Sequence, residues 1–185
     1  MTKGKTARVF RKLLMTAGML TMAALASQGA NAATQGTLGA TSTGTSLVSL
    51  TIAALYQITG LTDLALGAWS GSGNMTTNND VCVYTNDSTG NYHTLVTDSS
   101  GTSAFKVKSG ANAIPYTVNW NHVSGVVGNV AVTSGTALAV TGANTSSVTC
   151  GGLKDANYQV TFLSAALAAA PAGSYSTTLT MVIEP

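Results

Sequence analysis

The C-terminal stretch, residues 170–185, places the strongest constraint on how this chain can fold. From Tyr175 onward its residues alternate between two kinds of side chain. Because neighbouring side chains of a strand point to opposite faces, Leu179, Met181 and Ile183 share one apolar face with Tyr175. We expect this strand to pack that face against a core. We also expect one of its edges to need a partner from elsewhere, because no further strand follows it in the sequence.

The first 32 residues have the features of a secretory signal peptide. Five of the eight basic residues precede an apolar run over residues 13–26, and Ala30-Asn31-Ala32 is a cleavage site of the small-x-small type. An uncleaved N-terminal anchor is the alternative, but the run is shorter than the roughly 20 residues that usually span a bilayer. The sequence therefore predicts a protein exported to the periplasm or beyond.

Removal of the signal peptide changes the charge of the chain. Three lysines and six acids remain, which give a net charge of −3, and no arginine is left. A weakly acidic chain without arginine is not expected to bind nucleic acid, since that task needs clustered basic residues. The remaining residues are rich in Thr, Ser, Val and Gly, which are typical of strands and turns.

The mature chain reads as a flexible arm followed by one domain. Residues 33–46 are almost entirely small, and they predict a flexible N-terminal arm. Residues 47–185 contain about seven short strand patterns separated by turn signals, at intervals of roughly 8–15 residues. This spacing predicts a single all-β sandwich domain.

Four local expectations go with that prediction. The alternation of Leu47–Ile52 predicts the first strand, and the Gly/Ser/Asn-rich residues 69–80 predict a loop. Residues 92–97 are expected to pair back on the short strand at 81–84, across a turn at 86–90. Residues 114–120 are expected to form one strand that starts at a sheet edge, because Pro115 cannot donate to a sheet ladder.

Cys82 and Cys150 are the only cysteines of the chain. Because exported proteins meet an oxidising environment, we expect the two to form a disulfide. A catalytic thiol is the alternative reading, but neither cysteine has a histidine close by in sequence to lower its pKa.

The sequence shows little that could carry catalysis, a metal or a cofactor. The histidines are isolated, and no phosphate-binding or nucleophile motif follows a strand. An acid pair of Asp80 and Asp87 would be needed for a glycoside hydrolase, and we do not expect an enzyme. Trp69 lies in a Gly/Ser loop, and it is the residue best suited to contact a glycan if the protein is a secreted adhesin or carbohydrate-binding module.

Three segments together resemble spore coat protein U domains, a family that includes subunits of archaic chaperone–usher pili. The closing segment, residues 173–183, is similar to the family's C-terminal Gly-x-Tyr-x-x-x-Leu-x-hydrophobic-x-hydrophobic motif. Leu64-Ala-Leu-Gly67 and Ile114-Pro-Tyr-Thr-Val118 resemble an early and a middle strand of that family. The resemblance spans most of residues 45–185. It departs from the family at Ala53-Ala-Leu55, where the family usually has a cysteine.

The resemblance implies an immunoglobulin-like sandwich that lacks its final strand and is completed by a donor strand. In such pili a periplasmic chaperone first covers the gap, and the N-terminal extension of the next subunit then replaces the chaperone by strand addition. The resemblance also implies an outer-membrane usher as a partner. The implied groove strand here carries Leu179, Met181 and Ile183. The donor candidates are the alternating residues Val48, Leu50 and Ile52.

The protein would then be a structural subunit of a surface pilus or coat that serves cell adhesion. One alternative stays open: if Val48, Leu50 and Ile52 form the chain's own first strand, the protein is self-contained or ends a fibre.

Overall fold

The computed structural model describes residues 32–101, 103–125 and 130–185, and these divide after Thr51 into two units. Most of the predicted signal peptide, residues 1–31, lies outside the described part. None of the helices in the described ranges is long and apolar enough to cross a membrane.

The first unit, residues 32–51, is an extended arm whose side chains are exposed. Its one ordered feature joins Thr34 to Thr45 by two backbone hydrogen bonds of 3.0 Å each. The expected strand over Leu47–Ile52 is not formed. The physical reason is that no strand of the described residues pairs with this segment, and an alternating pattern becomes a strand only where a partner takes up its backbone groups.

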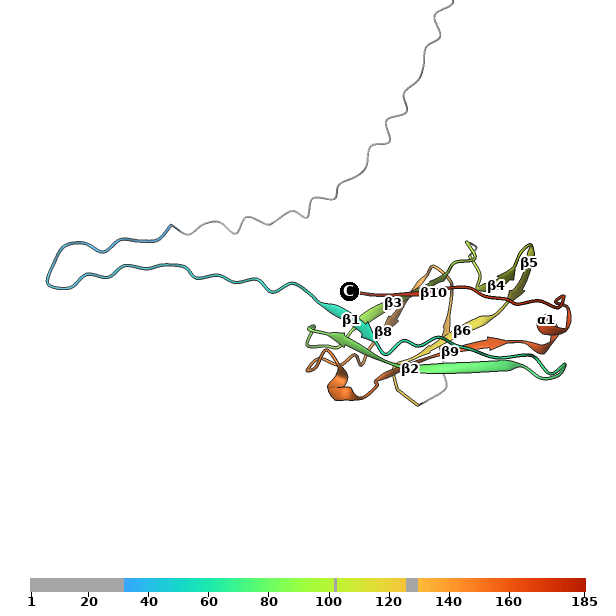
Figure 1. The fold of residues 1–185 in the computed structure, drawn as a ribbon. Helices are drawn as coiled ribbons and strands as arrows, with labels where there is room; N and C mark the ends of the chain where they lie inside the picture. Colours follow the sequence, from blue (N-terminus) through green and yellow to red (C-terminus); the bar gives the residue numbers. More distant parts are fainter. Residues whose placement is uncertain (1–31, 102, 126–129) are drawn as a thin grey trace, which may run out of the picture. The chain divides into compact units, whose positions relative to one another are not determined.

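The second unit, Ile52–Pro185, is an all-β sandwich of the immunoglobulin-like type, as predicted (Figure 1). One sheet has the order β1-β2-β9-β6-β7 and the other has the order β10-β3-β8, while β4 and β5 form a separate hairpin. Pairing within each sheet is antiparallel. The strands are β1 (Tyr56–Thr59), β2 (Met75–Thr85), β3 (Tyr92–Asp98), β4 (Lys106–Ser109), β5 (Asn112–Pro115), β6 (Thr117–Asn121), β7 (Val130–Val132), β8 (Ala137–Val140), β9 (Ala156–Phe162) and β10 (Leu179–Glu184). The two short helices are η1 (Cys150–Gly152) and α1 (Ser164–Ala168).

The core lies between the two sheets and is built from inward-facing residues of both. Trp120 of β6 is 1% exposed, and its indole Nε1 donates to the hydroxyl of Tyr92 on β3 over 3.0 Å. Their rings meet edge to face with centroids 6.5 Å apart, a favoured geometry for aromatic pairs. This pair ties the five-stranded sheet to the three-stranded sheet.

The expected loop at residues 69–80 ends earlier than predicted, because β2 already begins at Met75. Thr76, Asn78 and Asp80 point to the outer face of the sheet, opposite polar residues of β9. A strand whose first half has a polar outer face has the composition of a loop there, which is why the sequence alone did not reveal it.

Residues 92–97 do form a strand, but the expected pairing with residues 81–84 is wrong. β3 pairs with β10 and β8, whereas β2 pairs with β1 and β9. The turn between β2 and β3 therefore crosses from one sheet to the other. The connection of six residues, 86–91, is long enough for either a hairpin or a crossing between sheets, so its composition does not distinguish the two.

The single strand expected over residues 114–120 is two strands, β5 and β6, with Tyr116 between them. The backbone N–H of Tyr116 donates to Phe105 over 3.1 Å, and the next residue begins pairing with β9. Ile114, Tyr116, Val118 and Trp120 all face the core as predicted, with 7% exposure or less. The alternation is therefore right, and only the change of hydrogen-bond partner at Pro115–Tyr116 was missed.

Candidate functional site

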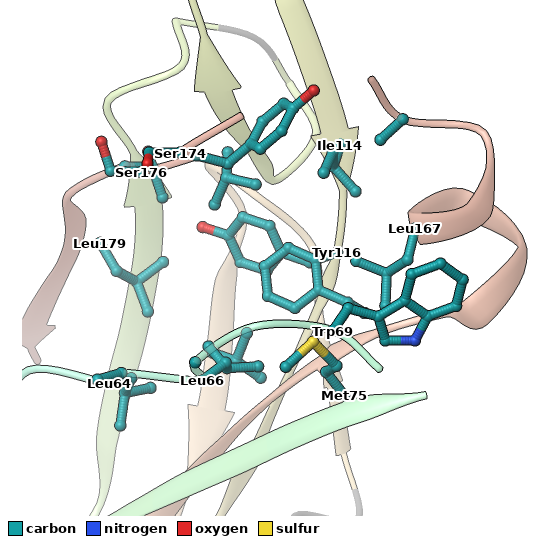
Figure 2. A pocket seen from close by; sticks show the side chains of 18 of the residues that line it. Leu64, Leu66, Trp69, Met75, Ile114, Tyr116, Leu167, Ser174, Ser176 and Leu179 are labelled. Atoms are coloured by element: carbon teal, nitrogen blue, oxygen red, sulfur yellow. The ribbon is translucent and has the colours of Figure 1, made fainter. Parts of the chain in front are cut away.

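An apolar groove of about 1350 Å³ runs along the sandwich between the segment 61–69 and the C-terminal segment 170–181 (Figure 2). Its floor is formed by core residues of both the sheets and the hairpin, so the groove opens directly onto the hydrophobic interior. The side chains at its floor and walls include Leu64, Leu66, Met75, Ile114, Tyr116, Val160, Phe162, Leu167 and Leu179.

The first wall of the groove, residues 61–69, is extended but forms no strand. Its backbone is held by the N–H of Thr62, which donates to the side chain of Asn79 over 3.2 Å, and by the Thr62 carbonyl, which accepts from Tyr158. Leu64 and Leu66 are half-buried and turn inward, while Ala65 between them is exposed. This wall therefore presents alternate apolar side chains to the groove. Within the described ranges of the chain, no strand pairs with its edge on the groove side.

The second wall is β10 and the residues that lead into it. β10 pairs with β3 along six residues, and in the described part of the chain no strand pairs with its other edge. The alternation predicted from sequence is confirmed. Leu179, Met181 and Ile183 are half-buried and pack on the core, whereas Thr180 is exposed and Val182 is 42% exposed. The open edge of β10 leaves backbone donors and acceptors available beside the groove.

Trp69 and α1 lie at one end of the groove (Figure 2). The indole Nε1 of Trp69 donates to the carbonyl oxygens of Ser72 and Gly73 over 3.1 and 3.0 Å, which fixes the ring against its own loop. Trp69 is half-buried and lines the groove beside Leu167 of α1. Its expected contact with a ligand stays a prediction.

The groove has almost no charge. Among its lining residues in the described ranges, Asp63 is the only acid and no base is present. Tyr116, on the floor, donates its hydroxyl to Asp98 over 3.1 Å, and burial raises the pKa of Tyr116 well above its ordinary value. An elongated, apolar groove with a single acid suits an apolar extended segment better than it suits a highly charged ligand.

Asp98 holds the groove wall from behind, at the end of β3 opposite Leu179. It accepts backbone hydrogen bonds from Ser100 and Lys106, at 3.0 and 2.6 Å, in addition to the bond from Tyr116. Burial by itself would raise the pKa of Asp98, but these hydrogen bonds together outweigh burial and lower its pKa below the usual value.

The structure brings together some of the predicted site residues and not others. Leu179 and Met181 line the groove, while Ile183 lies on the same face but beyond the groove lining. The donor candidates Val48, Leu50 and Ile52 are 91%, 85% and 74% exposed. Reading the sequence missed the wall at residues 61–69 as part of a site, although the alternation of Leu64 and Leu66 was a signal for it.

The predicted disulfide between Cys82 and Cys150 is present, with Cα atoms 5.9 Å apart. It joins the end of β2 to η1, next to the side chain of Asp155. Because the two sulfurs are bonded to each other, this group offers no thiolate ligands to a metal. The carboxylate of Asp155 instead accepts from the backbone N–H groups of Val83 and Asn144, at 2.8 and 2.9 Å.

No protein-family model matches this chain, and neither does any curated protein. A solved structure of a chaperone–tip adhesin complex of CFA/I fimbriae contains a chain that is similar to it, with a TM-score of 0.51 and 18% sequence identity. The similarity covers 70% of this chain and 41% of that chain, so this chain spans less than half the length of its structural neighbour. At this identity the likeness concerns the fold, and it agrees with the sandwich described above.

Proposed function

We propose that this protein is a structural subunit of a secreted surface fibre or coat, and that its groove is filled by a donor strand. The observation that carries the proposal is the apolar groove beside the unpaired edge of β10. A strand laid there would give β10 its missing hydrogen bonds and would bury alternate side chains, which is how strand addition gains affinity and specificity. The fimbrial setting of the structural neighbour supports this reading.

The exposed apolar residues of the arm suit the role of donor. Val48, Leu50 and Ile52 repeat every second residue, as the inward residues of the two groove walls also do. Burying each of them would contribute about 1.5–3 kcal/mol. Ser49 and Thr51 between them would face away from the core, which fits a strand with one apolar side.

The finer parts of the proposal follow from the resemblance to spore coat protein U domains. The protein would pass through the periplasm, where a chaperone shields the groove, and an outer-membrane usher would then join it to other copies or related subunits. We propose no catalytic activity for it.

The test compares inward and outward residues of the arm in the mature chain. We expect the unchanged chain to form a concentration-dependent series of oligomers in size-exclusion chromatography, and Val48→Ser with Leu50→Ser to abolish the series. Ser49→Ala with Thr51→Ala is the matched control and should assemble normally. A mature chain that is monomeric, soluble and cooperatively folded, with no strand exchanged, would contradict the proposal.

A second candidate function is a secreted adhesin or carbohydrate-binding module that uses Trp69. The observation in its favour is that the Trp69 ring lines the end of the groove. Titration with a panel of glycans while Trp fluorescence is recorded decides between the two. An unchanged fluorescence signal, together with full glycan affinity in Trp69→Ala, would dismiss this candidate.

A further inference from the structure

The root of the arm, residues 53–55, is held by one residue, Asn86. The backbone N–H of Leu55 donates to Oδ1 of Asn86 over 2.7 Å, and Nδ2 of Asn86 donates to the carbonyl of Ala53 over 2.8 Å. The backbone N–H of Asn86 also donates to the carbonyl of Leu55 over 3.2 Å. Three hydrogen bonds to a single residue therefore fix the direction in which the chain leaves the sandwich.

The side chain of Asn86 takes the place of the backbone of a further strand residue after β2. β2 ends at Thr85, which is paired with Tyr56, and the chain then turns through residues 86–90. The side-chain amide offers one acceptor and one donor, as a peptide group does. Asn86 thereby extends the antiparallel pairing to Ala53, three residues before the start of β1.

This continuation directs residues 53–55 away from the groove. β2 runs antiparallel to β1, and Met75 at its start lines the groove while Thr85 at its end lies beside Tyr56. The ten steps between Met75 and Thr85 correspond to roughly 34 Å along a strand. The root, beyond Thr85, therefore points out of the end of the sandwich opposite the groove.

The length of the chain limits how far the arm can return toward the groove of its own molecule. With residues 53–55 held in line with β1, the chain can first reverse at Ile52, so a fully extended return brings Val48 back to about the level of Tyr56. The groove begins at Leu61, five residues farther along. Val48 therefore falls short of the groove by roughly 17 Å, and Leu50 falls short by more.

Without the hydrogen bonds to Asn86, the arm could reach the groove of its own chain. If the chain could reverse directly before Tyr56, Val48 would reach about the level of Leu61, at the mouth of its own groove. Residues 38–46 could reach deeper, but Leu38 is the only bulky apolar residue among them. The held root thus decides whether the apolar residues of the arm can enter the groove of their own chain.

We propose that Asn86 is a positioning residue that prevents self-complementation and so reserves Val48, Leu50 and Ile52 for the groove of another copy. This inference rests on the proposed function, because it assumes that the groove takes a donor strand. It adds the residue that determines which molecule supplies that strand.

The experiment places a benzophenone amino acid at position 48 of the mature chain and mixes this protein with a ¹⁵N-labelled copy. After illumination, mass spectrometry of cross-linked peptides from residues 61–69 and 175–181 separates links within a chain from links between chains. We expect the unchanged sequence to give links between chains. We expect Asn86→Ala to raise the ratio of links within a chain to links between chains by roughly 30-fold, the factor that corresponds to two lost hydrogen bonds of about 1 kcal/mol each.

Two further variants test whether the effect is specific to the Asn86 hydrogen bonds. Asn91→Ala changes an exposed asparagine near the same turn that does not touch the root, and it should leave the ratio unchanged. Asn86→Asp keeps the acceptor for Leu55 but loses the donor to Ala53, and it should give an intermediate ratio even if Asn86→Ala does not fold.

The outcomes separate the two proposals. Groove links between chains with a ratio that Asn86→Ala and Asn86→Asp leave unchanged would overturn the role of Asn86 and leave the proposed function standing. Groove links within the chain in the unchanged protein would overturn the inference directly. No groove links of either kind would overturn the proposed function and the inference with it.

Discussion

Asp98 illustrates how a single carboxylate stabilises one wall of the groove. It accepts hydrogen bonds from the loop after β3, from the start of β4 and from Tyr116 on the groove floor. Because these bonds lower its pKa in the folded state, the stability they contribute is fully present above the unfolded pKa of about 3.9. That stability is lost as the pH falls below about 4 and through the lowered folded pKa.

We therefore predict that Asp98→Asn lowers the free energy of unfolding at pH 7 by about 1–3 kcal/mol. The difference from the unchanged protein should shrink as the pH falls below 4, since the native carboxylate then becomes protonated as well. Urea denaturation of the mature chain at a series of pH values measures this. Asp63→Asn, at an exposed acid of the groove wall, is the control and should have little effect. A difference that is constant with pH would contradict the explanation.

Trp69 offers a direct signal of groove filling. Its ring is half-buried at the end of the groove, whereas Trp120, the second tryptophan of the chain, is 1% exposed in the core. We predict that assembly of the mature chain shifts the Trp emission to shorter wavelength, because a donor strand removes water from the Trp69 ring. The shift should vanish in Trp69→Phe. A shift that persists in this variant would show that the signal arises elsewhere.

At the scale of elements, the two faces of β10 have separate tasks. The inward residues line the groove and pack on the core, while Thr180 and Val182 face out. We predict that Leu179→Ser reduces assembly at least tenfold, because it removes an apolar wall residue worth about 1.5–3 kcal/mol on burial. Thr180→Ser is the matched outward control and should assemble as the unchanged chain does. Concentration-dependent size-exclusion chromatography gives both values, and an equal loss in the two variants would contradict the assignment of faces.

The sequence predicted those elements whose two faces differ in polarity. The alternation in β10 and through Ile114–Trp120 was visible because apolar and polar residues take turns there. The first half of β2 escaped notice because its outer face is entirely polar and its inner residues include Thr77 and Asn79. Sheet membership of β3 was also missed, because partner choice depends on contacts far apart in the sequence.

The groove itself could be predicted only in part. Its β10 wall follows from a terminal strand with one apolar face, so Leu179 and Met181 could be named in advance. The opposite wall is an extended segment whose backbone bonds go to the side chain of Asn79 and the hydroxyl of Tyr158. The alternation of Leu64 and Leu66 is visible in the sequence, but only the tertiary fold shows that this segment forms a wall of the groove. The role of Asn86 is of the same kind, since turn composition explains its presence equally well.

At the scale of the whole molecule, the disulfide closes a large loop. Cys82 and Cys150 are 68 residues apart in sequence, and the loop between them contains β3 to β8. Chain entropy alone gives a stabilisation of about 4 kcal/mol for a loop of this length. We predict that Cys82→Ser with Cys150→Ser lowers the free energy of unfolding by up to that amount, as measured by urea denaturation. Reduction of the unchanged protein should have the same effect, and an effect below about 1 kcal/mol would show that the loop is already restrained without the bond.

The position of that disulfide has a consequence for how copies joined in a row would respond to tension. A pull on the arm would first load the hydrogen bonds between residues 53–55 and Asn86 and then β1, whose four residues pair with β2 up to Thr59 opposite Cys82. Antiparallel hydrogen bonds lie across the strand direction, so a lengthwise pull loads all of them at once instead of breaking them one after another. The last pair sits where β2 is covalently bonded to η1, so the load would pass from four pairs of residues into a bond that does not yield. In a fibre of such subunits, we expect the contacts between subunits to break under tension while each sandwich stays folded.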